Sequence, residues 1–217
     1  LFPMDAGGKI RSAGILRHLK GGAFATRLIM PADASERARF EAEIAALADE
    51  AAFWPHPRGG LARRARRVAG FLSPAPVSAA SDASAAARRA VRAALAAAPD
   101  LVVIDYAQSR LLAPEFLAQR HVIFAHNVEA EILARHAAAA RGPMRHVFAR
   151  EAGKMARFER EAVNRADAVI AVSERDAQAF RDGGARRAFA IPTGVDSGFF
   201  AYHPPADDAP PRVVFAG

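Results

Sequence analysis

Three short apolar runs constrain the fold of this chain more than any other feature of its sequence. They are "DLVVIDY" (100–106), "HVIFAHN" (121–127) and "ADAVIAVS" (166–173). A continuous apolar run of this length is typical of a strand that is buried on both faces. Helical patterns separate the runs, and strands that alternate with helices form βαβ units around a parallel sheet. The sequence therefore predicts an α/β fold with a mostly parallel sheet flanked by helices.

Weaker patterns predict the remaining elements. Two more strands are expected at 23–30 and 186–194. Helices are expected at 35–52 with Ser35 as its N-cap, at 61–72, at 82–98, near 108–119, from 128 to 165 with a break at 141–143, and at 174–184. Gly183 and Gly184 end the last of these helices, because glycine adopts the backbone conformation that commonly follows a helix.

Composition excludes several classes of protein. The chain has 217 residues and an apolar share of 52%, which suffices for a buried core. Cysteine is absent, so disulfides, thiolate metal sites and a cysteine nucleophile are excluded, and the cytoplasm is the expected location. No apolar run approaches the roughly 18 residues of a membrane-spanning helix. The first residues look like the end of a strand and "RVVFAG" (212–217) like the start of another, so we expect a piece of a longer protein.

Positive charge is the most unusual bulk property. The formal net charge is +7, which favours an anionic partner such as nucleic acid or an acidic membrane. The basic run "RGGLARRARR" (58–67) contains no aromatic residue on which bases could stack. We therefore expect no nucleic-acid partner. The run is interpreted either as a solvated helix face or as a surface for peripheral contact with an anionic membrane, at the inner membrane face.

The opening stretch "PMDAGGKIRSAG" (3–14) is a candidate anion site. It places Gly7 and Gly8 before a helical pattern, with Arg11 close behind. The spacing is neither that of the dinucleotide fingerprint G-x-G-x-x-G nor that of a P-loop, so NAD binding and P-loop phosphoryl transfer are disfavoured. Free N–H groups at the start of a helix favour negative charge. The glycines therefore indicate either a phosphate or sugar contact or a simple tight turn.

Ligands of parallel sheets bind beyond the carboxyl ends of the strands, and polar residues gather there in this sequence. Asp105 and Tyr106 end the apolar run at 100–106, and His126, Asn127 and Glu129 follow the apolar run "HVIFA" (121–125). An imidazole in this position can hold a hydroxyl group or pass a proton near neutral pH, or it can cap the next helix. No set of His, Asp and Glu residues has the spacing of a metal site, and no D-x-D pair is present.

Two later strand ends carry small polar residues. Ser173 precedes the helix at 174–184 and is interpreted as its N-cap. No G-x-S-x-G motif surrounds this serine, so an α/β-hydrolase is not supported. Thr193 and Gly194 lie in "IPTGVDSGFF" (191–200), which predicts a turn after the last strand.

Taken in order, these segments resemble the family 4 glycosyltransferases of the GT-B fold. "PMDAGGKIRSAGILRHL" is similar to the family's glycine loop and first helix, "HNVEAEIL" to the segment with its histidine, "ADAVIAVSERDAQAF" to its A-D-x-v-i-a-v-S strand and helix, and "IPTGVDSGFF" to its I-P-N-G-V-D-x-x-x-F motif. Thr193 stands where that motif usually has Asn. The resemblance is strongest over 121–217 and weakest over 53–98, and exopolysaccharide-type sugar transferases are the most similar variant.

The resemblance implies the N-terminal, acceptor-side half of a retaining glycosyltransferase. Such an enzyme moves a sugar from a nucleotide-sugar donor to a glycan or lipid-linked acceptor. The implied organisation is a Rossmann-like domain at 1–200, an interdomain linker at 201–211 and the first strand of a second domain at 212–217. That second domain supplies most donor contacts in the family, so this chain alone is expected to be inactive.

The resemblance also assigns roles to individual residues. His126 would contact the transferred sugar as the catalytic residue. The implied substrate-binding residues are Gly7, Gly8, Arg11, Asn127, Glu129, Ser173, Thr193 and Gly194. No metal and no cofactor is expected. The alternative is a non-catalytic sugar- or nucleotide-binding module of the same fold.

Overall fold

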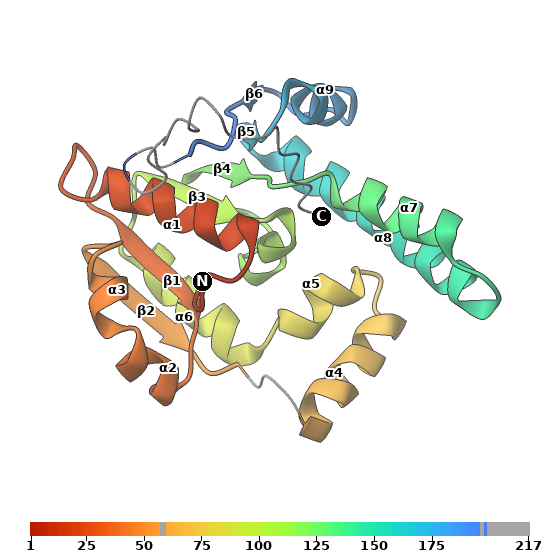
Figure 1. Ribbon diagram of the computed structural model, residues 1–217, viewed down its shortest axis with the longest axis horizontal. Coiled ribbons are helices and arrows are strands. Elements are labelled where there is room, and N and C mark those ends of the chain that lie inside the picture. The colour runs from red at the N-terminus through yellow and green to blue at the C-terminus, as the bar shows by residue number, and fades with distance from the viewer. Residues whose placement is uncertain (57–59, 196–197, 199–217) are drawn as a thin grey trace, which may run out of the picture.

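The computed structural model describes residues 1–56, 60–195 and 198, and it shows an α/β fold with two parallel sheets (Figure 1). The strands are β1 (Arg27–Pro31) and β2 (Glu50–Trp54) in one sheet, and β3 (Leu101–Asp105), β4 (Arg120–Phe124), β5 (Ala168–Ala171) and β6 (Ala188–Ala190) in the other. Every strand pair is parallel. The expected fold class is confirmed. The strands form two sheets where one was expected, because no described strand pairs with both β1 and β3.

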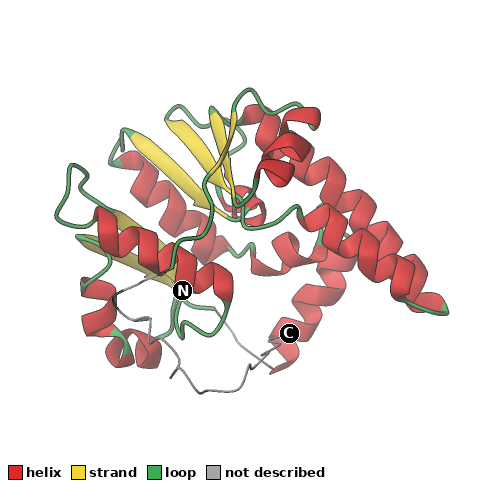
Figure 2. Ribbon diagram, turned by 45° about the horizontal axis from the view of Figure 1, so that its top comes forward, coloured by secondary structure: helices red, strands yellow, loops and turns green. Residues whose placement is uncertain are grey.

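Helices fill the segments between the strands (Figure 2). They are α1 (Gly7–Leu19), α2 (Ala34–Arg39), α3 (Glu41–Ala45), α4 (Gly60–Leu72), α5 (Val77–Asp82), α6 (Ala85–Ala96), the 3₁₀ helix η1 (Ala107–Leu112), α7 (Glu129–Ala139), α8 (Pro143–Arg165) and α9 (Glu174–Asp182). The predicted break near 141–143 is confirmed. Gly142 leaves the helical region with a φ of 59°, and Pro143 begins α8.

The expected helix at 35–52 is wrong in its second half. Its last residues form β2, which pairs along the whole length of β1. The helical part divides at Phe40 into α2 and α3. The N-cap is Asp33 and not Ser35, because the Asp33 carboxylate accepts from the Glu36 N–H at 2.9 Å while the Glu36 side chain accepts from the Asp33 N–H. These two hydrogen bonds form a capping box.

Two other helix predictions need correction. The segment before α6 contains the additional helix α5, so the predicted helix at 82–98 begins later than expected. The predicted helix near 108–119 is the short 3₁₀ helix η1. The predicted linker at 201–211 and strand at 212–217 lie outside the described residues, as do positions 57–59 of the basic region.

Parallel pairing brings the carboxyl ends of β3 to β6 to one edge of the second sheet. Asp105 lies opposite Phe124, and Phe124 lies opposite Ile170. The core under this sheet combines strand residues with α8 and α9; its members include Ile104, Ile123, Ala162, Val163, Val169, Ala177 and Phe180. The expectation that β3 is buried on both faces is wrong, since Leu101 and Val103 are 49% and 58% exposed. β3 is the edge strand of its sheet.

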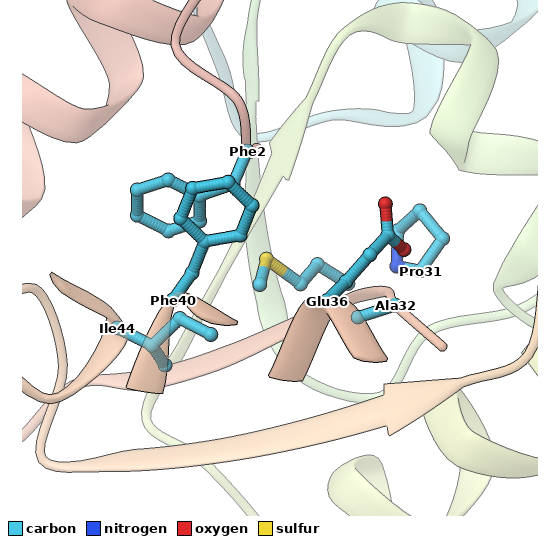
Figure 3. A pocket seen from close by; sticks show the side chains of 7 residues that line it. Phe2, Pro31, Ala32, Glu36, Phe40 and Ile44 are labelled. Atoms are coloured by element: carbon cyan, nitrogen blue, oxygen red, sulfur yellow. The ribbon is translucent and has the colours of Figure 1, made fainter. Parts of the chain in front are cut away.

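The first sheet has its own core, at the carboxyl end of β1 (Figure 3). The rings of Phe2 and Phe40 stack with their centroids 5.0 Å apart, and Ile44 packs beside them. The cavity that they line with Met30 has a volume of about 10 Å³, which is the room that a single water needs. It is a packing defect and too small for a sugar.

Candidate active site

A hydroxyl, a carboxylate and an imidazole from three separate elements meet at the carboxyl edge of the second sheet. Asp105 ends β3, and His126 follows β4 by two residues. Asp105 Oδ1 lies 2.7 Å from His126 Nε2, and Asp105 Oδ2 accepts from Ser12 Oγ of α1 at 2.8 Å. Ser12 Oγ is also 3.4 Å from His126 Nε2. Ser12, Asp105 and His126 are called the Asp105 cluster below.

The Asp105 cluster determines which ring nitrogen of His126 is available. A carboxylate oxygen only accepts hydrogen bonds, so the 2.7 Å contact with Asp105 places a proton on Nε2. Nδ1 can then accept from a hydroxyl when the ring is neutral and donate when it is charged. It lies on the side of α1, because a Cβ built on Gly8 would be 3.2 Å from it.

Aromatic rings enclose the imidazole. Tyr106 stacks on His126 with ring centroids 4.2 Å apart, and Phe124 approaches its edge at 4.9 Å. The side chain of His126 is consequently only 5% exposed, whereas that of Asp105 is 40% exposed. The carboxylate of Asp105 is therefore the group of the cluster that an incoming ligand meets first.

Tyr106 has a strained backbone. Its φ is 63°, in the left-handed region that non-glycine residues rarely adopt, and its N–H donates to the Phe124 carbonyl at 3.0 Å. Burial raises the pKa of the phenol, and the negative charges of Asp105 and Glu129 raise it further. The Tyr106 hydroxyl therefore keeps its proton at neutral pH and can donate it in a hydrogen bond.

The two opening glycines differ in their surroundings. A Cβ on Gly8 would lie 1.8 Å from the Tyr106 hydroxyl oxygen, whereas a Cβ on Gly7 would meet nothing within 4 Å. Glycine is needed at position 8 because the first turn of α1 touches the ring of Tyr106 there. Gly7 is the first helical residue and has open space around it. Ligand binding by these two glycines stays a prediction.

Arg11 lies inside the protein. Its Nη2 donates to the Ile191 carbonyl at 2.6 Å, and its guanidinium lies 4.2 Å from the centre of the Phe124 ring. Burial lowers the pKa of Arg11, and the nearby Asp105 opposes this effect. Nη1 is buried and has no hydrogen-bond partner among the described residues. Arg11 thus ties α1 to the segment after β6, and the phosphate contact predicted for it stays a prediction.

The start of α1 is suited to an anion. Ala6 is the N-cap and provides no side-chain hydrogen bond, and the first turn contains no acidic residue. The first N–H groups of a helix lack intrahelical acceptors, and the helix dipole favours negative charge beside them. Lys9 adds little to the attraction of an anion, because its Nζ is already 2.7 Å from Asp5 Oδ1 and 3.1 Å from the Pro3 carbonyl oxygen.

The residues after His126 lead into the first turn of α7. Asn127 is exposed, and Glu129 is the first residue of the helix. Glu159 of α8 accepts from the N–H groups of Glu129 and Ala130, both at 2.9 Å. Burial raises the pKa of Glu159 to about 7, although these two hydrogen bonds lower it. The sequence did not indicate Glu159, because its partners are backbone groups 29 and 30 positions away.

The last three predicted residues are Ser173, Thr193 and Gly194. Ser173 is the N-cap of α9 and accepts from the Asp176 N–H at 3.1 Å, which confirms that interpretation. Thr193 and Gly194 lie exposed in the segment after β6. Within the described part of the chain, none of these three residues forms a hydrogen bond with the Asp105 cluster.

The strand-end position indicated Asp105 and Tyr106, which the sequence left without an assigned role and which the fold brings to His126. Ser12 was not indicated by the sequence. Ser12 lies one helical turn beyond Gly8 and so on the same side of α1. That signal is weak, because one serine in a helix is common.

Two negative findings apply to residues 1–56, 60–195 and 198. No three His, Asp or Glu side chains gather there in a way that could hold a metal ion. None of the helices in these residues is both long enough and apolar enough to cross a membrane.

Parallel strands, flanking helices and polar side chains at the carboxyl edge define a Rossmann-like α/β protein, with its candidate site at that edge. The family model of Glycosyltransferase Family 4 matches residues 32–199, and the chain belongs to that family. The matched range includes Asp105, Tyr106 and His126 but begins after α1. Comparisons with curated proteins and with solved structures found no match.

Proposed function

We propose that this chain is the acceptor-side half of a GT-B glycosyltransferase of the exopolysaccharide type. The enzyme would transfer a hexose, with retention of anomeric configuration, from a nucleotide-sugar donor to a glycan or lipid-linked acceptor. Family membership supports sugar transfer in general. The observation that carries the finer proposal is the Asp105 cluster, which places a half-exposed carboxylate and a buried imidazole beside the uncapped start of α1.

In this proposal the two parts of the site bind different parts of the substrates. The carboxylate of Asp105 accepts a sugar hydroxyl, and Nδ1 of His126 holds a second polar group of the same sugar. The first N–H groups of α1 and Nη1 of Arg11 compensate the charge that develops on the departing diphosphate. Charge compensation of this kind is worth most in a site that excludes water.

We also propose a domain organisation and a cellular location for this enzyme. Residues 1–200 form the acceptor-side domain, 201–211 link it to a donor-binding domain, and 212–217 begin that domain. By itself the acceptor-side half binds substrate weakly and does not turn it over. The enzyme works in the cytoplasm, where nucleotide sugars are supplied, and a lipid-linked acceptor brings it to the inner membrane face.

A second candidate is a non-catalytic sugar- or nucleotide-binding module. The observation that favours it is the enclosure of His126, whose side chain is only 5% exposed. A binding module needs a rigid, satisfied polar cluster but no accessible imidazole. The two candidates differ in one measurable property, since only the transferase consumes a nucleotide sugar.

The test measures nucleotide release from a panel of nucleotide sugars by the enzyme that contains this domain. Asp105→Asn removes the negative charge and replaces one of the two acceptor oxygens by an NH2 donor, so that the side chain can no longer accept from Ser12 and His126 through separate oxygens; we expect kcat/KM to fall by about 100-fold. Asp100→Asn is the matched control, because Asp100 is exposed just before the opposite end of β3. Tight binding of a nucleotide sugar without its consumption would favour the binding module, and an equal loss in both variants would contradict the role of Asp105.

A further inference from the structure

The apolar side of α4 faces solvent. Leu61, Val68 and Leu72 are 82%, 66% and 77% exposed, and Ala65 lies exposed between them. Their spacing places all four on one side of the helix. These four residues are called the α4 stripe. A continuous row of large aliphatic side chains in water indicates a surface that another body covers.

The orientation of the α4 stripe is held by contacts on other sides of the helix. A Cβ on Gly70 would lie 3.3 Å from Ala80 Cβ, so α4 packs closely on α5 at that point. The Phe71 carbonyl accepts from Arg150 Nη1 at 2.6 Å and from Lys154 Nζ at 2.8 Å, both of α8. Figure 1 shows α4 at the periphery of the molecule, beyond α5. The stripe therefore points outward because the rest of the helix is anchored.

Positive charge accompanies the stripe. Arg64 and Arg67 are exposed on α4, and the sequence of this helix contains no acidic residue. A helix with an aliphatic side and adjacent arginines has the properties of helices that lie in the headgroup layer of a membrane. Each arginine near an anionic lipid surface strengthens binding, and the net charge of +7 acts in the same direction.

We propose that the α4 stripe docks on an anionic lipid bilayer. Leu61, Val68 and Leu72 enter the boundary between headgroups and acyl chains, and Arg64 and Arg67 bind lipid phosphates. A second copy of the chain fits this face less well, because arginines would meet arginines. A nucleic acid would pair with the arginines but leave the aliphatic row in water. The proposal stands independently of sugar transfer.

The test is flotation of the purified chain with two kinds of vesicle, phosphatidylcholine alone and an equal mixture of phosphatidylcholine and phosphatidylglycerol. The triple variant Leu61→Gln, Val68→Gln, Leu72→Gln removes the aliphatic row and keeps residues that favour helix. The double variant Arg64→Gln, Arg67→Gln removes two charges. The control variant Phe24→Gln, Phe116→Gln changes two residues that are 61% and 83% exposed elsewhere on the molecule.

We expect the wild type and the control variant to bind the mixed vesicles and to be released by salt. The triple variant should lose at least about tenfold in partition coefficient, and the double variant roughly 25-fold, at about fivefold for each arginine. Circular dichroism and thermal unfolding of each variant exclude misfolding as the cause. Equal binding to both vesicle types, binding that the triple variant retains, or no binding at all would overturn the proposal. Self-association that the triple variant abolishes, or nucleic-acid binding without vesicle binding, would assign the stripe to those partners instead.

Discussion

Replacement of Gly8 by alanine tests the packing on which the candidate site depends. The new Cβ would lie 1.8 Å from the Tyr106 hydroxyl oxygen, 2.9 Å from Tyr106 Cζ and 3.2 Å from His126 Nδ1. Ordinary contacts of this kind are about 3.4 Å or longer, so the phenol must move by roughly 1.6 Å. The backbone of Tyr106 is held at a φ of 63° by its hydrogen bond to Phe124, so the shift falls on the ring and its stacking partner His126.

The expected cost follows from three contributions. Overpacking costs about 1–3 kcal/mol, and loss of the stacking between Tyr106 and His126 costs up to about 1.5 kcal/mol. The gain in helix propensity from glycine to alanine offsets about 0.5–1 kcal/mol. Gly8→Ala should therefore lower the free energy of unfolding by about 2 kcal/mol, within a range of roughly 0–4 kcal/mol. Gly7→Ala is the matched control, and it should be neutral or slightly stabilising because nothing lies near its Cβ.

Denaturant unfolding of both variants measures this difference. A double-mutant cycle with Tyr106→Gly, which removes the phenol and tolerates the positive φ, should show a coupling of about 1–2 kcal/mol between positions 8 and 106. Sugar transfer by the complete enzyme should fall by more than the loss of folded protein explains, because His126 loses its stacking contact with Tyr106. Equal stability of Gly8→Ala and Gly7→Ala, or an absence of coupling with Tyr106, would refute the reasoning.

Three further predictions concern stability. Burial raises the pKa of Glu159 from 4.5 to about 7, so the folded state binds this proton more tightly. The contribution of Glu159 to the free energy of unfolding should be greatest below pH 4.5 and fall by about 3 kcal/mol as the pH rises to about 7, and the difference in free energy of unfolding between the wild type and Glu159→Gln should follow this profile. Lys154→Met removes the nearer cation of the buried Glu151 carboxylate, at 2.8 Å, while Arg150 Nη1 at 3.5 Å and the Val77 N–H remain; it should cost about 1–3 kcal/mol in denaturant unfolding, while Lys9→Met at an exposed pair should cost less than about 1 kcal/mol. Ser173→Ala should cost about 1 kcal/mol through loss of the α9 cap and leave sugar transfer unchanged.

Each of these predictions has an outcome that contradicts it. A difference between the wild type and Glu159→Gln that does not change with pH would show that Glu159 is better solvated than its burial indicates. If Lys154→Met and Lys9→Met lower the free energy of unfolding by similar amounts, burial does not determine how much the Lys154 ion pair stabilises the protein. A loss of sugar transfer in Ser173→Ala beyond its loss of stability would give this hydroxyl the substrate contact that the family resemblance implies.

Part of the fold was determined by sequence signals that act over a few residues. The apolar runs of β4 and β5 identified buried strands, and Gly142 followed by Pro143 identified the break between α7 and α8. The cap of α9 by Ser173 needs only its neighbour Asp176. These predictions are confirmed because backbone preference and side-chain hydrogen bonding within one turn decide them.

Other features depended on partners far along the chain. Residues 50–52 belonged to the predicted helix, yet Glu50–Trp54 form β2 because β1 offers a complete row of backbone partners. The exposure of Leu101 and Val103 depends on the position of β3 at the edge of its sheet. Local preference cannot decide either outcome, because sheet pairing joins segments that are remote in sequence.

The same division applies to the candidate site. The sequence alone determined that polar residues such as His126 follow the strands, and hence which edge of the sheet carries function. Only the tertiary structure decided that Ser12 meets Asp105 across 93 positions and that Arg11 turns inward to Ile191 across 180. Parallel strands with helical crossovers place distant strand ends at one edge, so the identity of the meeting residues depends on strand order and helix rotation, which no short segment of the chain encodes.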